Sequence, residues 1–145
     1  MNPRYTNAHM RVAFIYANLS RATRRKCGCV IVKDDRIVSI GFNGTPPGWD
    51  NCCEDEHGAT LPEVLHAEAN AIAKLARSDE SGEGADVFVT LEPCLGCAKL
   101  LSQVKVRSVY FHDIYKSSHG LEGGVEFLRK CGINVYQITL PTQEQ

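Results

Sequence analysis

The sequence predicts an α/β protein, a three-layer α/β/α sandwich around a five-stranded mixed sheet. Three observations lead to this prediction. Two β-branched runs separated by two aspartates indicate a hairpin in the first half, and strand and helix patterns alternate through the second half. An alanine-rich helical segment has an apolar face narrow enough to pack closely on a sheet. Because a helix separates the last two strands, we expect them to be parallel, with a right-handed connection.

The first half begins with a helix and a hairpin. Residues 7–19 predict the helix, with Asn7 as its N-cap. The apolar face of this helix comprises Met10, Ala13, Phe14 and Ala17. Residues 29–33 and 36–42 predict the two hairpin strands, which an Asp-Asp pair joins.

A long loop and a second helix follow. Residues 43–58 contain several glycines and prolines that break regular structure, and loops of this length are usually functional. Residues 63–77 predict an alanine-rich helix, and a capping box at residues 60–63 precedes it. The expected apolar face of this helix comprises Ala69, Ile72, Ala73 and Ala76.

The second half alternates strand and helix. It comprises a strand at residues 86–91, a helix at 94–104, a strand at 107–111, a helix at 121–131 and a strand at 133–138. These five elements complete the sheet and its two helical layers.

Length and composition restrict the kind of protein. The chain has 145 residues, which favours a single domain spanning residues 1–145. Its 43% hydrophobic and 23% charged residues exclude wholesale disorder. The 16 basic and 17 acidic side chains give a net charge of −1, which disfavours nucleic acid as a partner but leaves room for a local basic pocket.

The terminus and the cysteines indicate a compartment. No apolar run is long enough to span a membrane, and the first residues lack the apolar core of a signal peptide. We therefore expect a cytoplasmic protein with no membrane partner. In that reducing compartment the seven cysteines favour metal ligands or buried thiols over disulfides.

Two short motifs carry the chemistry. Residues 66–68 read His-Ala-Glu, and residues 93–97 read Pro-Cys-Leu-Gly-Cys. Each motif opens a predicted helix, and a strand lies between them. His66, Cys94 and Cys97 are three zinc ligands, and a tetrahedral zinc with three protein ligands keeps one position open for water, which is typical of catalytic sites. The alternative is three unrelated buried residues.

Glu68 is the candidate catalytic base. Two thiolates weaken the Lewis acidity of a zinc ion, so its water needs a nearby carboxylate to take a proton. His66 and Glu68 lie about 200° apart around a regular helix, so both can approach one metal only beyond the helix end. We therefore expect the helix to begin near His66 rather than at the capping box. The alternative for Glu68 is an exposed helix glutamate.

The two motifs resemble those of the zinc-dependent cytidine/deoxycytidylate deaminase superfamily, to which the chain is similar over residues 5–138. Further segments occur in the order seen in the branch that acts on deoxycytidylate (dCMP): Ser20, Arg24, residues 28–32, Gly41-Phe-Asn-Gly44 and Asp113-Ile-Tyr115. The resemblance implies a cytidine deaminase-like fold, with zinc on His66, Cys94 and Cys97 and Glu68 as the proton shuttle. It implies hydrolysis of dCMP to dUMP and ammonia.

The resemblance also implies substrate contacts. Asn43 is expected to hydrogen-bond the sugar, Tyr115 to pack against the pyrimidine, and Arg24 to meet the 5′-phosphate. Arg24 belongs to a dense basic cluster at residues 21–26, for which a solvated turn is the alternative. Ala67 and Ser20 are further expected substrate contacts.

Regulation and assembly are expected from the resemblance as well. The family is often hexameric, with dCTP as activator and dTTP as inhibitor, and Mg²⁺ would accompany a triphosphate effector. Gly41, Phe42 and Gly44 are the expected effector site, where Phe42 replaces the family's tyrosine.

A second, structural zinc is left open. Cys52, Cys53 and His57 lie in the long loop and are its candidate ligands, together with Cys27 or Cys29. Loop thiols and a surface histidine are the alternative. Relatives that carry such a zinc use a cysteine near the end of the first helix, where this chain has Ala22 and Thr23.

Two other functions remain as alternatives. One is deamination of another base, such as tRNA adenosine, guanine or free cytidine. The other is a nucleotide-sensing module with a structural zinc. A basic cluster fit for one phosphate favours a nucleotide substrate, and Glu68 favours an enzyme.

Overall fold

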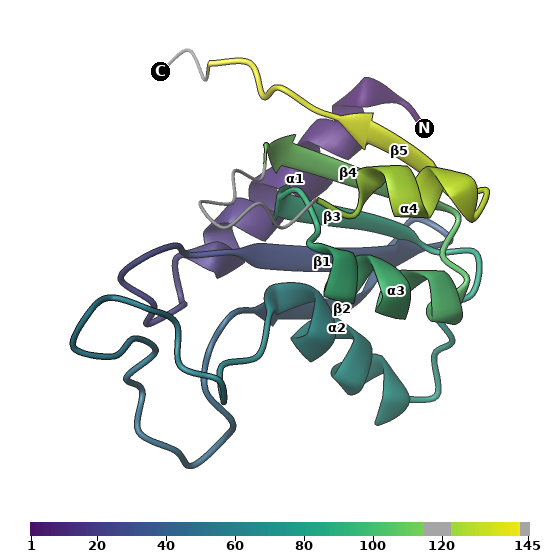
Figure 1. Cartoon of the computed structure of the whole chain (residues 1–145). Helices are drawn as coiled ribbons and strands as arrows, with labels where there is room; N and C mark the ends of the chain where they lie inside the picture. Colours follow the sequence, from purple (N-terminus) through teal and green to yellow (C-terminus); the bar gives the residue numbers. More distant parts are fainter. Residues whose placement is uncertain (115–122, 143–145) are drawn as a thin grey trace.

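The computed structural model of the chain describes residues 1–114 and 123–142, and its architecture confirms the predicted fold class (Figure 1). A five-stranded mixed sheet has the strand order β2-β1-β3-β4-β5, and β3, β4 and β5 are parallel. The elements are α1 (Pro3–Ala17), β1 (Gly28–Lys33), β2 (Arg36–Phe42), α2 (Ala67–Ala76), β3 (Asp86–Leu91), α3 (Leu95–Val104), β4 (Ser108–Asp113), α4 (Val125–Lys130) and β5 (Asn134–Gln137).

The first helix begins earlier than the sequence predicted. Asn2, not Asn7, is the N-cap of α1, and its side-chain oxygen accepts a hydrogen bond from the backbone N–H of Arg4 at 2.9 Å. Pro3 follows at the first helical position, where the missing N–H costs nothing. Met10, Ala13 and other inward residues of α1 lie against one face of the sheet.

The predicted hairpin is confirmed. β1 and β2 pair in antiparallel fashion, and their connection consists of Asp34 and Asp35, with φ angles of 52° and 60°. Two consecutive left-handed residues give a turn whose twist matches that of the flanking strands, and aspartate tolerates this conformation. β1 also pairs with β3 in antiparallel fashion, which joins the hairpin to the parallel half of the sheet.

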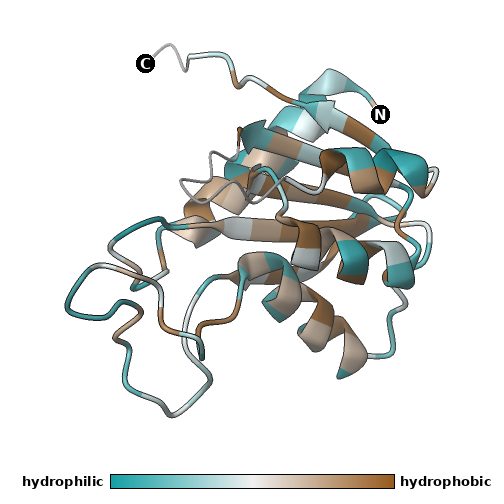
Figure 2. Cartoon of the chain, in the orientation of Figure 1, coloured by the Kyte–Doolittle hydropathy of each residue, from teal (hydrophilic) through white to brown (hydrophobic). Residues whose placement is uncertain are grey.

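The sheet separates two apolar cores. On one face α1 packs against Val30, Val32, Phe88 and Tyr110. The opposite face packs against α2, α3 and α4 and forms the larger core. Figure 2 shows the hydrophobic residues running through the central strands and along the helices.

No helix in the described part of the chain is both long and apolar enough to cross a membrane.

The buried face of α2 differs from the predicted one. Its buried residues are Ala67, Glu68, Ala71 and Leu75. Gly41 in β2 explains this orientation, since a Cβ at that position would lie 2.2 Å from the carbonyl oxygen of Ala67 and 2.6 Å from the backbone nitrogen of Ala71. The absent side chain lets the first turns of α2 rest directly on the strand.

Candidate active site

Three candidate metal ligands meet where two helices begin. His66 is the N-cap residue of α2, Cys94 is the N-cap residue of α3, and Cys97 lies in the first turn of α3. The Nδ1 atom of His66 lies 3.3 Å from the sulfur of Cys97 and 3.5 Å from the sulfur of Cys94. Within the described residues this is the only group of three or more histidine, cysteine or acidic side chains with ligand atoms close enough for a metal.

The predicted start of the second helix is confirmed. α2 begins at Ala67, and His66 has extended backbone dihedral angles of −71° and 157°. The capping box at residues 60–63 does not start the helix. Because His66 lies just outside the first turn, its imidazole extends beyond the helix end while Glu68 stays within that turn.

The ligand separations fit a zinc ion. Zinc–sulfur bonds of about 2.3 Å and zinc–nitrogen bonds of about 2.0–2.1 Å at a tetrahedral angle require a sulfur–nitrogen separation of about 3.5 Å. The two observed separations, 3.3 and 3.5 Å, match this requirement. A set of one imidazole and two thiols also binds zinc in preference to magnesium or calcium.

Hydrogen bonds favour the thiolate form of one of the two cysteines, Cys94. A hydrogen bond from the Cys97 thiol is the largest of the effects that lower the pKa of Cys94 to about 4. The backbone N–H of Cys97 also donates to the Cys94 sulfur, at 3.5 Å. A hydrogen bond with Cys94 raises the pKa of His66. Cys94 is thus favoured as a thiolate and His66 as an imidazolium, whereas the hydrogen bond with Cys94 and burial raise the pKa of the Cys97 thiol.

Glu68 lies inside the protein beside the ligands. It is only 5% exposed, and its carboxylate lies beside the Cys97 thiol. Burial is the main cause that raises the pKa of this carboxyl above its ordinary value. A raised pKa makes the ionised carboxylate a better proton acceptor, which suits general acid–base chemistry.

Asn43 and Ser20 hold a neighbouring segment in place. The side-chain oxygen of Asn43 accepts from the backbone N–H of Cys27 at 2.9 Å, and its amide nitrogen donates to the carbonyl of Arg25 at 2.8 Å. Ser20 is 2% exposed, and its hydroxyl donates to the carbonyl of Asn43 at 2.7 Å. Both side chains that were predicted to contact substrate thus have backbone partners here.

The predicted phosphate ligand lies on an exposed turn. The backbone N–H groups of Thr23 and Arg24 donate to one carboxylate oxygen of Glu54, at 2.9 and 3.0 Å. Next to them, the guanidinium of Arg25 forms an ion pair with Asp113 at the end of β4. The side chain of Arg24 is exposed.

The predicted effector residues lie along the end of β2. Gly41 is buried under α2, and the carbonyl of Phe42 accepts a hydrogen bond from the Asn70 amide at 2.8 Å. Gly44 forms an isolated bridge with Leu65, just before His66. Ala67, a predicted substrate contact, is fully buried at the first position of α2.

The candidates for a second zinc are not gathered among the described residues. The Cys52 thiol is exposed and donates to the carbonyl of Glu54 at 3.1 Å. Cys53 is 1% exposed, and its thiol donates to the carbonyl of Asn51 at 3.5 Å. His57 is exposed and pairs with Glu56, its sequence neighbour, at 3.3 Å. These contacts match the alternative of loop thiols and a surface histidine.

Tyr115, the predicted contact to the pyrimidine, lies outside the described residues.

Sequence reasoning missed several residues at the site. Glu54 and Asp113 were missed as partners of the basic residues because those partners lie 30 and 88 positions away. Gly123 and Gly124 were missed too. A Cβ at Gly124 would lie 2.3 Å from the Cβ of Ala98, so the glycine lets this segment cross the start of α3. No local spacing signals contacts of this kind.

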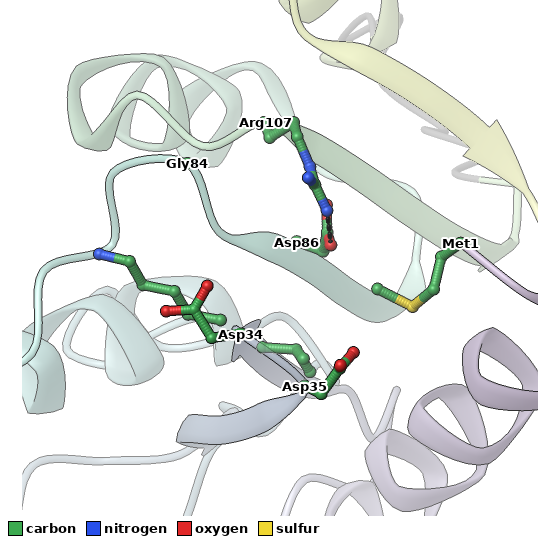
Figure 3. A pocket seen from close by; sticks show the side chains of 8 residues that line it. Met1, Asp34, Asp35, Gly84, Asp86 and Arg107 are labelled. Atoms are coloured by element: carbon green, nitrogen blue, oxygen red, sulfur yellow. Dashed lines mark hydrogen bonds and ion pairs between the residues drawn. The ribbon is translucent and has the colours of Figure 1, made fainter.

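A cavity of about 220 Å³ lies at the end of β1 and the start of β3, away from the candidate metal ligands (Figure 3). Asp34, Asp35, Asp86 and Arg107 contribute to its lining. Arg107 binds both carboxylate oxygens of the buried Asp86, at 3.1 and 2.6 Å. This pair joins the first residue of β3 to the residue just before β4, whereas Cys94 and Cys97 follow the last residue of β3. The cavity includes no predicted site residue.

A family comparison covers most of the chain. The family described as the cytidine and deoxycytidylate deaminase zinc-binding region matches residues 4–113. These residues include both motifs and every ligand of the three-residue group.

Individual relatives agree with the family match. The dCMP deaminase of cyanophage S-TIM5, solved with dCMP and dUMP, is 39% identical, with a TM-score of 0.89, over 95% of this chain and 99% of that chain. The deoxycytidylate deaminase of phage T4 is 29% identical over 89% of this chain and 87% of its own length. The deoxycytidylate deaminase of Saccharomyces cerevisiae is 31% identical over 96% of this chain, which spans about half (46%) of the yeast protein.

Proposed function

The chain belongs to the cytidine and deoxycytidylate deaminase family, and from that membership we propose that it converts dCMP and water to dUMP and ammonia. One observation carries the proposal. An imidazole and two thiols gather at the N-termini of α2 and α3, beside the buried carboxylate of Glu68. The likeness to the cyanophage enzyme over nearly the full length of both chains supports dCMP as the substrate.

The roles of the site residues follow from their chemistry. His66, Cys94 and Cys97 would hold one catalytic zinc ion, which supplies the Lewis acid that activates water. Glu68 accepts a proton from the attacking water and delivers it to N3 of the cytosine as the water oxygen bonds to carbon 4. Glu68 then takes the second proton, from the new hydroxyl group, and gives it to the leaving amino nitrogen, so that the carbonyl forms and ammonia departs. The raised pKa of Glu68 helps this carboxyl perform both steps.

Recognition of the nucleotide involves the segments around this centre. Asn43 contacts the sugar, Tyr115 packs on the base, and Arg24 meets the 5′-phosphate, as the resemblance implies. Ala67 and Ser20 border the same space. The exposed position of Arg24 supports its part, because a guanidinium that faces solvent can reach a phosphate.

The proposal also covers regulation and assembly. A single domain of residues 1–145 would act in the cytoplasm as a hexamer, with dCTP as activator and dTTP as inhibitor. Gly41, Phe42 and Gly44 would border the effector, with Mg²⁺ on its triphosphate. A structural zinc at Cys52, Cys53 and His57 would require the long loop to rearrange.

A substrate panel tests the function. Zinc-loaded protein is incubated with dCMP, deoxycytidine, dCTP, cytosine and a tRNA, and released ammonia is measured. We expect the highest kcat/KM with dCMP, because only a phosphorylated nucleotide of this size uses both the metal site and the basic residues. Equal turnover of deoxycytidine would show that the protein does not recognise the 5′-phosphate. Turnover of tRNA alone would contradict dCMP as the substrate.

A further inference from the structure

The segment between α1 and β1 is a surface turn rich in positive charge. We call residues 20–27 the basic turn; it contains Arg21, Arg24, Arg25 and Lys26. It has no helix or strand until β1 begins to pair, and its four cationic residues are exposed. Packing holds only Ser20, Ala22 and Cys27 of this turn, so the like charges between them repel unless polar contacts fix the backbone.

Side chains from distant segments hold the backbone of the basic turn. Asn43 binds the carbonyl of Arg25 and the N–H of Cys27, and Glu54 binds the N–H groups of Thr23 and Arg24. These contacts fix the conformation of the turn without using any of its charged side chains.

Of the two side chains that hold the backbone of the turn, Glu54 is the charged one. One of its oxygens accepts from both backbone N–H groups, at 2.9 and 3.0 Å. The hydrogen bond from Arg24 is the largest of the effects that lower the pKa of Glu54, so this carboxyl is ionised at neutral pH. Hydrogen bonds to an ionised acceptor are stronger than neutral ones.

The Glu54 contact is distinct from the packing of the protein. Glu54 belongs to neither apolar core. It lies in the long loop between β2 and α2, 30 residues from Arg24. Within the described part of the chain, no ion pair engages the guanidinium of Arg24, because the carboxylate binds the backbone instead. The arginine therefore faces solvent on a turn of fixed shape.

The basic turn also adjoins the metal site. Cys27, at its end, packs against the core cluster that contains Ala67, the residue after His66. The backbone N–H of the next residue, Gly28, donates at 3.1 Å to Thr90 in β3, the strand that leads to Cys94. Arg25 reaches the Cys27 thiol and pairs with Asp113. A phosphate on a nucleotide whose base lies at the metal site can thus be met by this turn.

We propose that Glu54 is a positioning residue that fixes the basic turn so that Arg24 can bind the 5′-phosphate, which makes Glu54 a determinant of the preference for nucleotide over nucleoside. The inference rests on the proposed function. Ordering the turn in advance reduces the conformational entropy that phosphate binding would otherwise cost.

Steady-state kinetics with matched variants test this inference. Glu54→Ala removes the acceptor, Glu54→Gln keeps a neutral acceptor of the same shape, and Glu56→Gln is the control. Glu56 lies two positions away, and its described ion pair is with His57. For Glu54→Ala we expect the KM for dCMP to rise about tenfold, as for loss of one pre-ordered side chain, with the KM for deoxycytidine and both kcat values unchanged. Glu54→Gln keeps the acceptor oxygen but not its charge, so its KM for dCMP should lie between those of wild type and Glu54→Ala. Glu56→Gln should behave as wild type.

Each other result would contradict the inference. An equal rise of KM for both substrates, or a fall of kcat, would show a general structural role. A lower KM for dCMP would show that Glu54 competes with the phosphate. A Glu56→Gln effect of the same size would show that the overall charge of the loop, and not Glu54 itself, sets the KM.

Circular dichroism checks folding, and Glu54→Asp, one methylene shorter, replaces the alanine variant if that variant does not fold. If wild-type protein fails to deaminate dCMP, the proposed function itself fails, whereas active wild type with no substrate-dependent change overturns this inference alone.

Discussion

Glu68 combines two properties that oppose each other in most proteins. It is an acidic side chain only 5% exposed, and it lies in the first turn of a helix, where negative charge is favoured. Burial raises the pKa of its carboxyl, while the nearby His66 lowers it. A buried carboxyl without a catalytic role would be costly to retain, so its position is itself an argument for proton transfer.

We expect Glu68→Gln to lower kcat for dCMP by about 10²–10⁴-fold, the usual contribution of a general acid–base group. The amide is isosteric but cannot take the proton. Zinc content, measured on the same preparation by atomic emission, should equal that of wild type because the ligands are untouched. Full activity would eliminate Glu68 as the shuttle, and loss of zinc would make it part of the metal site instead.

Single residues were predictable to different degrees. The motif spacing brought His66, Cys94 and Cys97 together correctly, since ligand chemistry limits where these side chains can lie. For Asn43 and Ser20 the sequence revealed a polar side chain but not its backbone partners, which depend on how distant loops meet. Glu54 had no signal at all for the same reason.

The helix N-termini are the elements that build the site. α2 and α3 each begin with a metal-ligand candidate at the N-cap position, where the backbone N–H groups of the first turn favour negative charge. α2 can lie close enough to the sheet because β2 has no side chain at Gly41. The position of His66 therefore depends on a glycine 25 positions earlier in the chain.

Gly41→Ala should destabilise the protein by about 1–3 kcal/mol, the usual cost of forcing extra volume into a packed contact. Its new Cβ would overlap the backbone of Ala67 and Ala71, so α2 must move away from the sheet. Chemical denaturation measures the stability, and zinc affinity should fall as well. Gly44→Ala is the control, because a Cβ there meets nothing within 4 Å; equal effects of the two substitutions would contradict this account of α2.

Element boundaries were predicted best where chemistry constrained them. The start of α2 was correct because two side chains had to reach one metal. The start of α1 was wrong because Asn2 and Pro3 together form a stronger start signal than Asn7. The buried face of α2 was also wrong, because the close contact with Gly41, rather than the alanine pattern, sets its rotation.

At the scale of the whole molecule, the sheet brings together segments that are distant in sequence. β3 leads directly into the motif at Cys94, and α2 packs against β2 two strands away. The parallel order of the last three strands was predictable from the helices between them. The path of the long loop was not, because its contacts with the basic turn follow no periodic pattern.

Removal of zinc should lower the stability of the whole protein. A metal bound by His66, Cys94 and Cys97 links α2 to α3, and a ligand present at 1,000 times its Kd stabilises the folded state by about 4 kcal/mol. With a strong chelator we expect Tm to fall by roughly 10 °C. Zinc should restore Tm and activity, and magnesium should restore neither. An unchanged Tm in protein shown to be metal-free would mean that the three side chains do not hold the ion.

X-ray absorption at the zinc edge of the loaded protein tests the central claim most directly, because it counts the atoms around the metal. We expect one zinc per chain, with two sulfur ligands, one imidazole nitrogen and one further light atom supplied by solvent. Three or four sulfur ligands, or a second imidazole in the fourth position, would close the place where water must be activated and would contradict the account.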